Sequence, residues 1–171
     1  MLRTSPPAIA FVGSSDSGKT TLITKLIAIY SRQGLQIGAI KHHRHEFDID
    51  REGKDSWRLA RAGAASTVIT SPTQTALIRK TARQLAPEEI IAAYGDDLDL
   101  VLVEGFKESR LPKIEVHRLA RRPDLICRGS RNDPDLIAVA SDRQWELDVP
   151  VFSLDDSKKL AAFILDFCRR R

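Results

Sequence analysis

The segment Gly13–Thr20 has the residue types and the spacing of a phosphate-binding loop. It reads GSSDSGKT and matches the pattern G-x-x-x-x-G-K-[ST] at every fixed position. In such a loop the glycines let the backbone curl, so that successive N–H groups point inward at phosphate oxygens. Lys19 is placed to reach the β- and γ-phosphates of a nucleotide, and the Thr20 hydroxyl is placed to hold Mg²⁺. We therefore expect a nucleoside triphosphate site built from Gly13, Ser14, Ser15, Asp16, Ser17, Gly18, Lys19 and Thr20.

The residues on either side of this loop favour a binding site over a chance glycine-rich turn. A short apolar run, Ile9–Val12, precedes the loop and is typical of a buried strand. A helix with one apolar stripe follows, and Gly34 is placed to end it. The stripe consists of Leu22, Ile23, Leu26, Ile27 and Tyr30. Because the first amides of a helix carry the positive end of its dipole, this order of elements suits an anion at the loop.

A phosphate loop also needs a carboxylate at the end of a neighbouring strand to organise the metal ion. The run Leu98–Val103 is the strongest strand signal in the chain, and Glu104 and Gly105 follow it directly. We expect Glu104 at the carboxyl end of the sheet as a metal ligand or an organiser of water, the alternative being a solvated acid. Gly105 is expected to leave its amide free for a γ-phosphate. Asp99 stands at the wrong end of this strand and is expected to be a surface or capping residue.

A polar loop, Lys41–Gly53, follows the predicted strand Ile37–Ile40 and is rich in His and Asp. His42 and His45 are three residues apart, but no third soft ligand accompanies them, so the pattern is weak for zinc. A loop that senses the γ-phosphate and a loop that is merely solvated remain two open interpretations.

The rest of the chain alternates strands with helices, interrupted by one hairpin. Helices are expected from Asp55 or Ser56 to Arg61 with Gly63 closing the turn, from Pro87, and from near Asp155; further strands are expected at Thr67–Thr70, Thr75–Ile78, Lys113–Val116 and Leu136–Ala140. This pattern predicts an α/β fold, a three-layer P-loop NTPase sandwich with a largely parallel, mixed sheet and one β-hairpin. No linker is evident, so residues 1–171 are expected to form a single domain.

Composition limits the remaining classes. The net charge of +4 favours anionic ligands in general, but it is too small to argue for nucleic acid, and we expect none. Cys127 and Cys168 are far apart and fit reduced thiols better than a disulfide or a zinc site. The apolar runs are too short to span a bilayer, and the first residues lead straight into the phosphate loop, so a cytoplasmic protein without a membrane partner is expected.

Several stretches taken in order resemble one family. They are GSSDSGKTT, KHHRHEFDIDREGKDS, RLARAGA, LVEGFK and IAVASD, and they span the chain from about Ile9 to Asp142. The phosphate loop is common to many proteins, whereas the K-H-x-x-H…D-x-D-x-x-G-K-D-S stretch followed by V-E-G-F-K is far more specific. The sequence resembles the MobB family, the adapter proteins of molybdopterin guanine dinucleotide biosynthesis.

That resemblance implies a GTP-binding protein with weak or no GTPase activity of its own, which assists MobA, the enzyme that joins GMP to molybdopterin. It extends nucleotide binding to Thr21, with GTP and Mg²⁺ as the bound groups and Glu104 and Lys19 as the residues nearest to catalysis. It also implies candidates for the switch and for the surroundings of the metal, namely Lys41, His42, Asp48, Asp50 and Glu104–Lys107.

Three features stay open at this stage. Asp142 follows a predicted strand and could read guanine through its N–H groups, or it could be an ordinary loop or capping residue. The segment Arg118–Arg131 holds five arginines and one acid. It could contact a pterin phosphate or a partner protein, or it could be a solvated loop. The sequence shows no evident route from these arginines to a γ-phosphate. The hairpin Thr67–Ile78 offers an edge for a homodimer.

Two other functions are compatible with a phosphate loop. A small-molecule kinase would need a lid with arginines aimed at the phosphates, which only the Arg118–Arg131 segment could supply. An ATP-dependent metal-delivery protein would need a cluster of cysteines or histidines, which Cys127 and Cys168 do not form.

Overall fold

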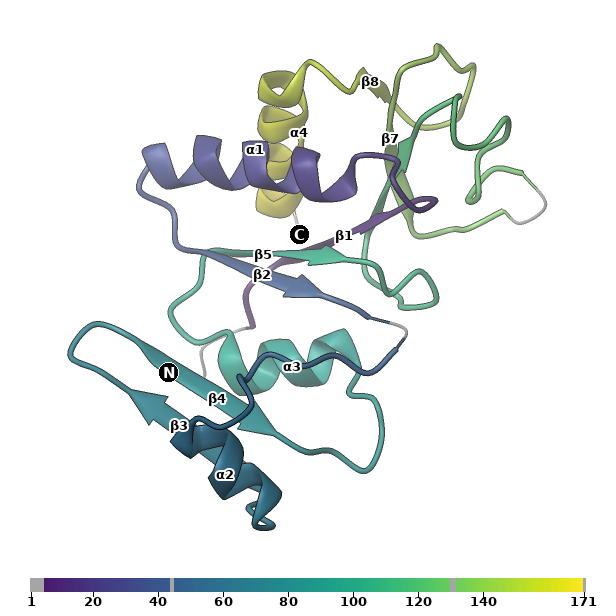
Figure 1. Ribbon diagram of the computed structural model, residues 1–171. Helices are drawn as coiled ribbons and strands as arrows, with labels where there is room; N and C mark the ends of the chain where they lie inside the picture. The colour runs from purple at the N-terminus through teal and green to yellow at the C-terminus, as the bar shows by residue number, and fades with distance from the viewer. Residues whose placement is uncertain (1–4, 44, 130–131, 171) are drawn as a thin grey trace. The chain divides into compact units, whose positions relative to one another are not determined.

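The computed structural model describes residues 5–43, 45–129 and 132–170, which form two compact units. The first unit contains the chain up to His42 and again from Ala86 onward, and the second is His43–Leu85. Figure 1 shows the helices and strands of both units. No helix of the described chain is both long enough and apolar enough to cross a bilayer.

The first unit is built on a six-stranded sheet in which every pair of neighbouring strands is parallel. The strands, in the order in which they lie side by side, are β2 (Ile37–Lys41), β5 (Leu100–Glu104), β1 (Ala8–Val12), β6 (Lys113–His117), β7 (Leu136–Ser141) and β8 (Val151–Ser153). The carboxyl ends of β1, β5 and β6 therefore lie next to one another, with β1 in the middle. The expected α/β fold with a largely parallel sheet is confirmed.

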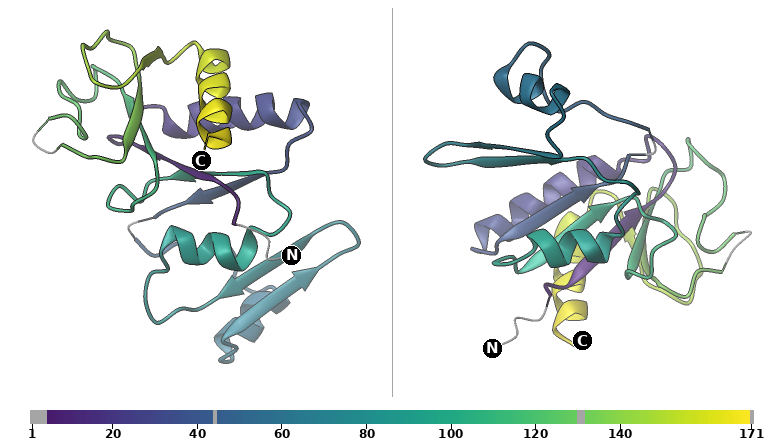
Figure 2. Two further views of the ribbon diagram at one scale, coloured as in Figure 1. Left: turned by 180° about the vertical axis from the view of Figure 1, so that it is seen from behind. Right: turned by 90° about the horizontal axis from the view of Figure 1, so that it is seen from below.

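Helices cover both faces of this sheet (Figures 1 and 2). The helices α1 (Lys19–Arg32) and α4 (Ser157–Arg169) share one apolar core with alternate strand residues such as Phe11 and Leu102. The intervening strand residues, such as Ala10 and Val103, pack with α3 (Pro87–Tyr94) on the opposite face. Because strand side chains alternate between faces, these two cores give the three layers that the sequence predicts.

The predicted stripe of α1 explains how this helix is anchored. Leu22, Ile23, Leu26 and Tyr30 are its buried residues, and the Tyr30 hydroxyl donates to the carbonyl oxygen of Ala161 in α4 over 3.1 Å. The helix ends at Arg32 with Gln33 as its C-cap, and Gly34 follows with a φ of +84°, a conformation that glycine adopts at little cost. Burial of this stripe fixes α1, and with it the loop from which α1 starts.

The second unit contains α2 (Asp55–Arg61) and the hairpin of β3 (Ser66–Thr70) and β4 (Thr75–Arg79). The two strands pair antiparallel as a sheet of their own, which confirms the predicted hairpin. At its turn the Ser71 hydroxyl accepts from the amides of Thr73 and Gln74. Several large apolar side chains of this unit are exposed: Phe47, Ile49, Leu59, Val68, Ile69 and Leu77.

Element bounds differ from the expected ones at a few places. The short edge strand β8 was not predicted, since its three residues carry too little pattern. The last helix begins at Ser157, because the Asp156 carboxylate accepts from the Lys159 amide and caps it. The strand expected at Leu98–Val103 starts two residues later and includes Glu104. Asp99 holds the start of β2 by accepting from the Gln36 amide over 2.7 Å, as expected of a surface or capping residue.

Candidate nucleotide-binding site

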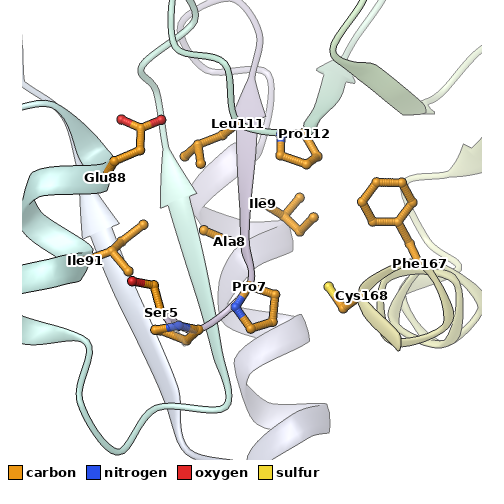
Figure 3. A pocket seen from close by; sticks show the side chains of 11 residues that line it. Ser5, Pro7, Ala8, Ile9, Glu88, Ile91, Leu111, Pro112, Phe167 and Cys168 are labelled. Carbon is orange, nitrogen blue, oxygen red and sulfur yellow. The ribbon is translucent and has the colours of Figure 1, made fainter. Parts of the chain in front are cut away.

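Two hollows of the first unit differ in chemistry and in position. One, of about 560 Å³, lies at the amino end of β1 and is lined mostly by apolar groups, such as Ile9, Leu111 and Phe167, with Glu88 at its side (Figure 3). The other, of about 460 Å³, lies at the start of α1 and is lined by Ser15, Asp16, Gly18, Lys19, Thr20, Thr21, Lys41 and Glu104. Ligands of open α/β sheets bind at the carboxyl ends of the strands, so the second, polar hollow is the candidate site.

The loop between β1 and α1 is shaped by its two outer glycines. Gly13 has a φ of +151°, and a methyl group in place of its hydrogen would lie 2.2 Å from the Val116 carbonyl oxygen of β6. Gly18 has a φ of +96° and is the cap residue of α1, where no side chain caps the helix and the first turn holds no acid. The amides at the start of α1 therefore keep their positive dipole end for an external anion. Both glycines predicted from the pattern are needed for this shape.

Lys19 curls back over the loop that precedes it. Its Nζ donates to the carbonyl oxygens of Gly13 over 3.2 Å and Ser14 over 2.6 Å. Burial lowers the pKa of Lys19 below its ordinary value, while the nearby Glu104 carboxylate acts in the opposite direction. A phosphate group in this hollow would restore favourable surroundings for the ammonium ion.

The Glu104 carboxylate contacts two other predicted site residues, Thr20 and Lys41. Its Oε2 accepts from the Thr20 hydroxyl over 2.7 Å, and its Oε1 pairs with Lys41 Nζ over 3.3 Å. The side chain of Glu104 is only 15 % exposed, whereas its partners Thr20 and Lys41 are exposed. The strand register explains the convergence, because Glu104 lies opposite Phe11 of β1 and Lys41 of β2. A hydroxyl, a carboxylate and two ammonium groups thus meet at one edge of the sheet.

The expectation that Gly105 keeps its amide free is wrong. The Gly105 N–H donates to the Phe11 carbonyl oxygen over 3.0 Å, because the backbone hydrogen bonds between β5 and β1 continue one residue past Glu104. Gly105 has a φ of +100°, and a methyl group there would lie 3.0 Å from Cβ of His42. Glycine is therefore needed at this position for the path of the backbone and for the approach of His42.

His42 lies directly after β2, at the same edge of the sheet as Glu104. Its amide donates to the Glu104 carbonyl oxygen over 2.9 Å, and its ring stacks on Phe106 with centroids 4.4 Å apart. The ring atom Nε2 is buried and has no hydrogen-bond partner in the described chain, and the same is true of Ser17 Oγ in the phosphate loop. Buried polar atoms are normally paired, so both atoms are suited to a ligand or to the water around one.

Asp142 follows β7, and its Oδ1 accepts from the Leu119 amide over 2.9 Å. This bond ties the end of β7 to the segment after β6, which is the loop role considered as the alternative to base reading. It uses one of the two carboxylate oxygens. Guanine recognition by Asp142 stays a prediction.

The arginines between Arg118 and Arg131 differ in their surroundings. Arg128 has a structural role, since it donates twice to the Asp148 carboxylate, over 2.8 and 2.9 Å, and once to the Asp133 carbonyl oxygen over 2.6 Å. Arg122 Nε donates to the Asp124 carbonyl oxygen over 3.0 Å. Arg118 lies at the phosphate loop, 3.6 Å from where a methyl group on Gly18 would be. Arg131 lies outside the described residues.

Sequence reasoning missed Arg118 as a site residue. The signal that could have found it is its position directly after the strand Lys113–His117, since that strand neighbours β1 in the sheet. The pairing order of parallel strands is not readable from local pattern, so the segment seemed to have no route to the loop.

Buried ionic groups of β6 hold the backbone that follows this strand. Lys113 pairs with Asp133 over 3.2 Å and with Asp135 over 3.4 Å, and its side chain is almost fully buried. The Glu115 carboxylate accepts from the amides of Ile126 over 2.6 Å and Cys127 over 2.8 Å. Buried charges are tolerated when they are paired in this way, and these contacts fix the course of the chain between β6 and β7.

Asp48 and Asp50, the remaining predicted metal ligands, belong to the second unit. There, Asp50 Oδ1 accepts from the Arg51 amide over 2.8 Å and from the Ser56 hydroxyl over 2.9 Å, which joins the loop to the start of α2. Asp48 and His45 are exposed. Within the described ranges, no three His, Cys, Asp or Glu side chains are grouped so as to hold a metal ion. A magnesium ion bound with a nucleotide takes much of its coordination from phosphate and water, and needs only one or two protein ligands.

Known proteins similar to this chain show the family to which it belongs. The family model described as molybdopterin guanine dinucleotide synthesis protein B matches residues 8–142. The molybdopterin-guanine dinucleotide biosynthesis adapter protein of Escherichia coli (strain K12) is 37% identical over 174 aligned positions, covering 99% of this chain and 97% of that protein. The protein of the same name from Haemophilus influenzae is 33% identical, over 92% of this chain and 87% of that protein.

Solved structures give the same result. The crystal structure of Bacillus subtilis MobB matches with a TM-score of 0.73 at 27% identity, covering 94% of this chain and 96% of that one. The MobB homologue from Bacillus stearothermophilus matches with a TM-score of 0.69 at 28% identity, covering 96% and 99%. The family model, the relatives and the shared fold lead to one conclusion: the chain belongs to the molybdopterin guanine dinucleotide synthesis protein B family, MobB.

Proposed function

We propose that this chain is a GTP-binding adapter of molybdopterin guanine dinucleotide biosynthesis, which assists a MobA-type guanylyltransferase. The observation that carries the proposal is the 2.7 Å contact between the Thr20 hydroxyl and the Glu104 carboxylate, beside an uncapped helix start and Lys19. Hydroxyl, carboxylate and lysine are the groups by which phosphate loops hold a nucleotide and its metal ion. The names of the relatives supply the biosynthetic process, and the site supplies the ligand class.

Thr20 and Glu104 are the residues that would hold Mg²⁺, because they already place two oxygen atoms, the ligand type that Mg²⁺ prefers, within hydrogen-bond distance. The ion would supply neutralisation of the charge on the β- and γ-phosphates. Lys41 Nζ pairs with the Glu104 carboxylate and would be released to a phosphate or to solvent when the ion binds. Asp48 and Asp50 are further candidates for this metal, and the Lys41–Asp50 loop is the segment proposed to respond to the γ-phosphate.

The proposed catalytic contribution is small. Lys19 and Glu104 can neutralise charge and organise the metal shell, but a fast GTPase also needs a side chain that orients the attacking water. No residue of the described site has a geometry that commits it to this task. We therefore assign the chain the role of a binding and delivery protein, with molybdopterin and the guanylyltransferase as the partners it would serve.

A homodimer formed through the second unit is part of the proposal. Val68, Ile69 and Leu77 of the hairpin are 60, 46 and 43% exposed, although they are large and apolar. Such side chains on exposed strands favour pairing with a second copy of the same surface. Sedimentation equilibrium of the wild type and of a Val68→Lys/Leu77→Lys double variant tests this: the wild type should be a dimer and the variant a monomer.

Calorimetric titration of GTP with Mg²⁺ tests the nucleotide site. The wild type should bind, and Lys19→Ala should not, because this lysine supplies charge to phosphates and no core packing. Lys25→Ala is the matched control, since Lys25 is exposed on the same helix. Equal GTP affinities of the wild type and Lys19→Ala would refute the site. Adding the wild type, but not Lys19→Ala, should raise the GMP-transfer rate of a MobA-type enzyme.

A further inference from the structure

We infer that Arg118 binds the α- and β-phosphate part of the nucleotide, from the side of the phosphate loop that faces away from Glu104. This inference rests on the proposed nucleotide site and adds a residue to it. It starts from one contact: a methyl group built on Gly18 would lie 3.6 Å from Nη2 of Arg118. The guanidinium group therefore lies beside the loop, at the residue that caps α1.

The strand order decides on which side Arg118 acts. β1, which leads into the loop, lies between β5 and β6. Glu104 ends β5 on one side, and Arg118 follows β6 on the other. The metal ion that Thr20 and Glu104 would hold would neutralise charge on the β- and γ-phosphates, so Glu104 would lie on the γ-phosphate side. Arg118 consequently stands on the side toward which the phosphate chain continues to the α-phosphate and the nucleoside.

The charges around Arg118 favour the binding of an anion. The start of α1 has a positive dipole end without an acid in its first turn, and the same loop holds Lys19 and one acid, Asp16, which acts on Lys19. With the Arg118 guanidinium beside them, the positive charges exceed this one carboxylate, which favours a bound anion. Among the described residues, no carboxylate forms an ion pair with Arg118. Arginine presents a planar fork of N–H donors that matches phosphate oxygens, so a phosphate satisfies both its charge and its geometry.

The backbone at Arg118 is held from both sides, which reduces the entropy lost on binding. His117 is buried, with Nδ1 3.0 Å from the Ser141 hydroxyl and Nε2 2.8 Å from the Arg122 carbonyl oxygen. The Arg118 carbonyl oxygen accepts from the Arg121 amide over 2.9 Å, and the Leu119 amide donates to Asp142 over 2.9 Å. The side chain is exposed while its backbone is fixed, as expected of a residue that awaits a ligand.

The test is titration of GDP and GTP, with Mg²⁺, into the wild type, Arg118→Gln, Arg118→Lys and Arg121→Gln. Arg118→Gln should weaken both nucleotides by the same factor, roughly 10- to 100-fold, as expected for a lost charge-assisted bond. Arg118→Lys should recover part of the loss. Arg121→Gln removes a neighbouring exposed charge and should bind as the wild type does. The Arg118→Gln deficit should shrink as KCl is raised, because the contact is ionic.

The outcomes separate this inference from the proposed function. If the wild type binds nucleotide, Lys19→Ala does not, and Arg118→Gln binds as the wild type does, the nucleotide site stands and the role of Arg118 is refuted. A loss confined to GTP would place Arg118 at the γ-phosphate and overturn the assignment. A deficit independent of salt would indicate stacking on the base and overturn it too. If the wild type binds neither nucleotide, both proposals fall. The unfolding midpoint without ligand should be equal in the wild type and in Arg118→Gln, since the side chain is exposed.

Discussion

The Thr20 hydroxyl donates to the Glu104 carboxylate over 2.7 Å, although the two residues are 84 positions apart in the chain. Parallel pairing of β1 with β5 places Glu104 opposite Phe11, one residue before the strand ends at Val12. The loop then brings α1 back over the same edge of the sheet. The contact is therefore a direct product of the fold, and it joins the two residues that the proposed metal ion requires.

Glu104→Gln should weaken binding of GTP in the presence of Mg²⁺ and have little effect on binding of GDP without it. The amide oxygen of glutamine can still accept from Thr20, so the fold is kept. The negative charge that the Glu104 carboxylate presents to the metal ion is lost. The predicted loss is about 10- to 100-fold, the usual range for one charged contact. Titration at several Mg²⁺ concentrations measures it. Glu146→Gln is the control, since Glu146 is exposed. If the affinity of the wild type for GTP did not depend on the Mg²⁺ concentration, the assignment of Glu104 as a metal ligand would be contradicted.

Asp142→Asn should reduce affinity for GTP far more than for ATP if Asp142 reads guanine. The asparagine oxygen can still accept from the Leu119 amide, so the link between β7 and the segment after β6 survives the change. What is lost is the charge that favours guanine N1–H and N2–H₂, worth roughly 1.5–3 kcal/mol. Competition binding with the two nucleotides checks this prediction. Equal losses for both would mean that Asp142 acts only on the loop and that another group selects the base.

The isolated protein should turn over GTP slowly, in the range of unassisted small GTPases at about 10⁻⁴–10⁻² s⁻¹. The reason is that no described residue is committed to orienting water, and that Arg118 stands on the side of β6 rather than beside Glu104. Steady-state release of inorganic phosphate measures the rate, with Lys19→Ala as the blank. Turnover near 1 s⁻¹ without a partner would favour a self-sufficient enzyme over an adapter.

The parts that could be predicted from sequence were those encoded in local pattern. The phosphate loop has fixed residues at fixed spacing, the stripe of α1 has a helical period, and Glu104 ends an unmistakable buried strand. The Gly105 amide was misjudged because a ladder bond depends on a partner strand, here Phe11. Arg118 was missed for a related reason, since only the strand order places it at Gly18.

The interior of the β6 strand shows a different limit. Lys113, Glu115 and His117 alternate with Ile114 and Val116, a pattern that usually indicates one solvated face. All five are buried, because Lys113 pairs with Asp133 and Asp135, and Glu115 accepts from backbone amides of the following segment. The ring of His117 is paired with the Ser141 hydroxyl and the Arg122 carbonyl oxygen. Such pairing is long-range, and a single sequence does not reveal it.

Two buried groups, the Cys127 thiol and the Tyr30 hydroxyl, should lower the stability of the folded chain at alkaline pH. Burial raises the pKa of the Cys127 thiol from 9.0 to about 12, with the Glu115 carboxylate adding to the effect, and it raises the pKa of the Tyr30 hydroxyl well above its ordinary 10.0. The folded chain therefore keeps protons that the unfolded chain releases. The contribution of these two groups to the free energy of unfolding has its full value below about pH 9 and is lost as the pH rises toward 12. Each group that is protonated only in the folded state contributes a slope of up to about 1.4 kcal/mol per pH unit.

Urea unfolding of the wild type, Cys127→Ala and Tyr30→Phe between pH 8 and pH 11 checks this expectation. Both variants should be less stable than the wild type at pH 8, since each removes a buried group and Tyr30→Phe also leaves the Ala161 carbonyl oxygen without its donor. Both should then lose less stability per pH unit above pH 9. Tyr94→Phe is the matched control, because the Tyr94 side chain is 50% exposed and the change is expected to leave the slope close to that of the wild type. Equal alkaline slopes in all four proteins would show that neither Cys127 nor Tyr30 holds its proton in the way their burial requires.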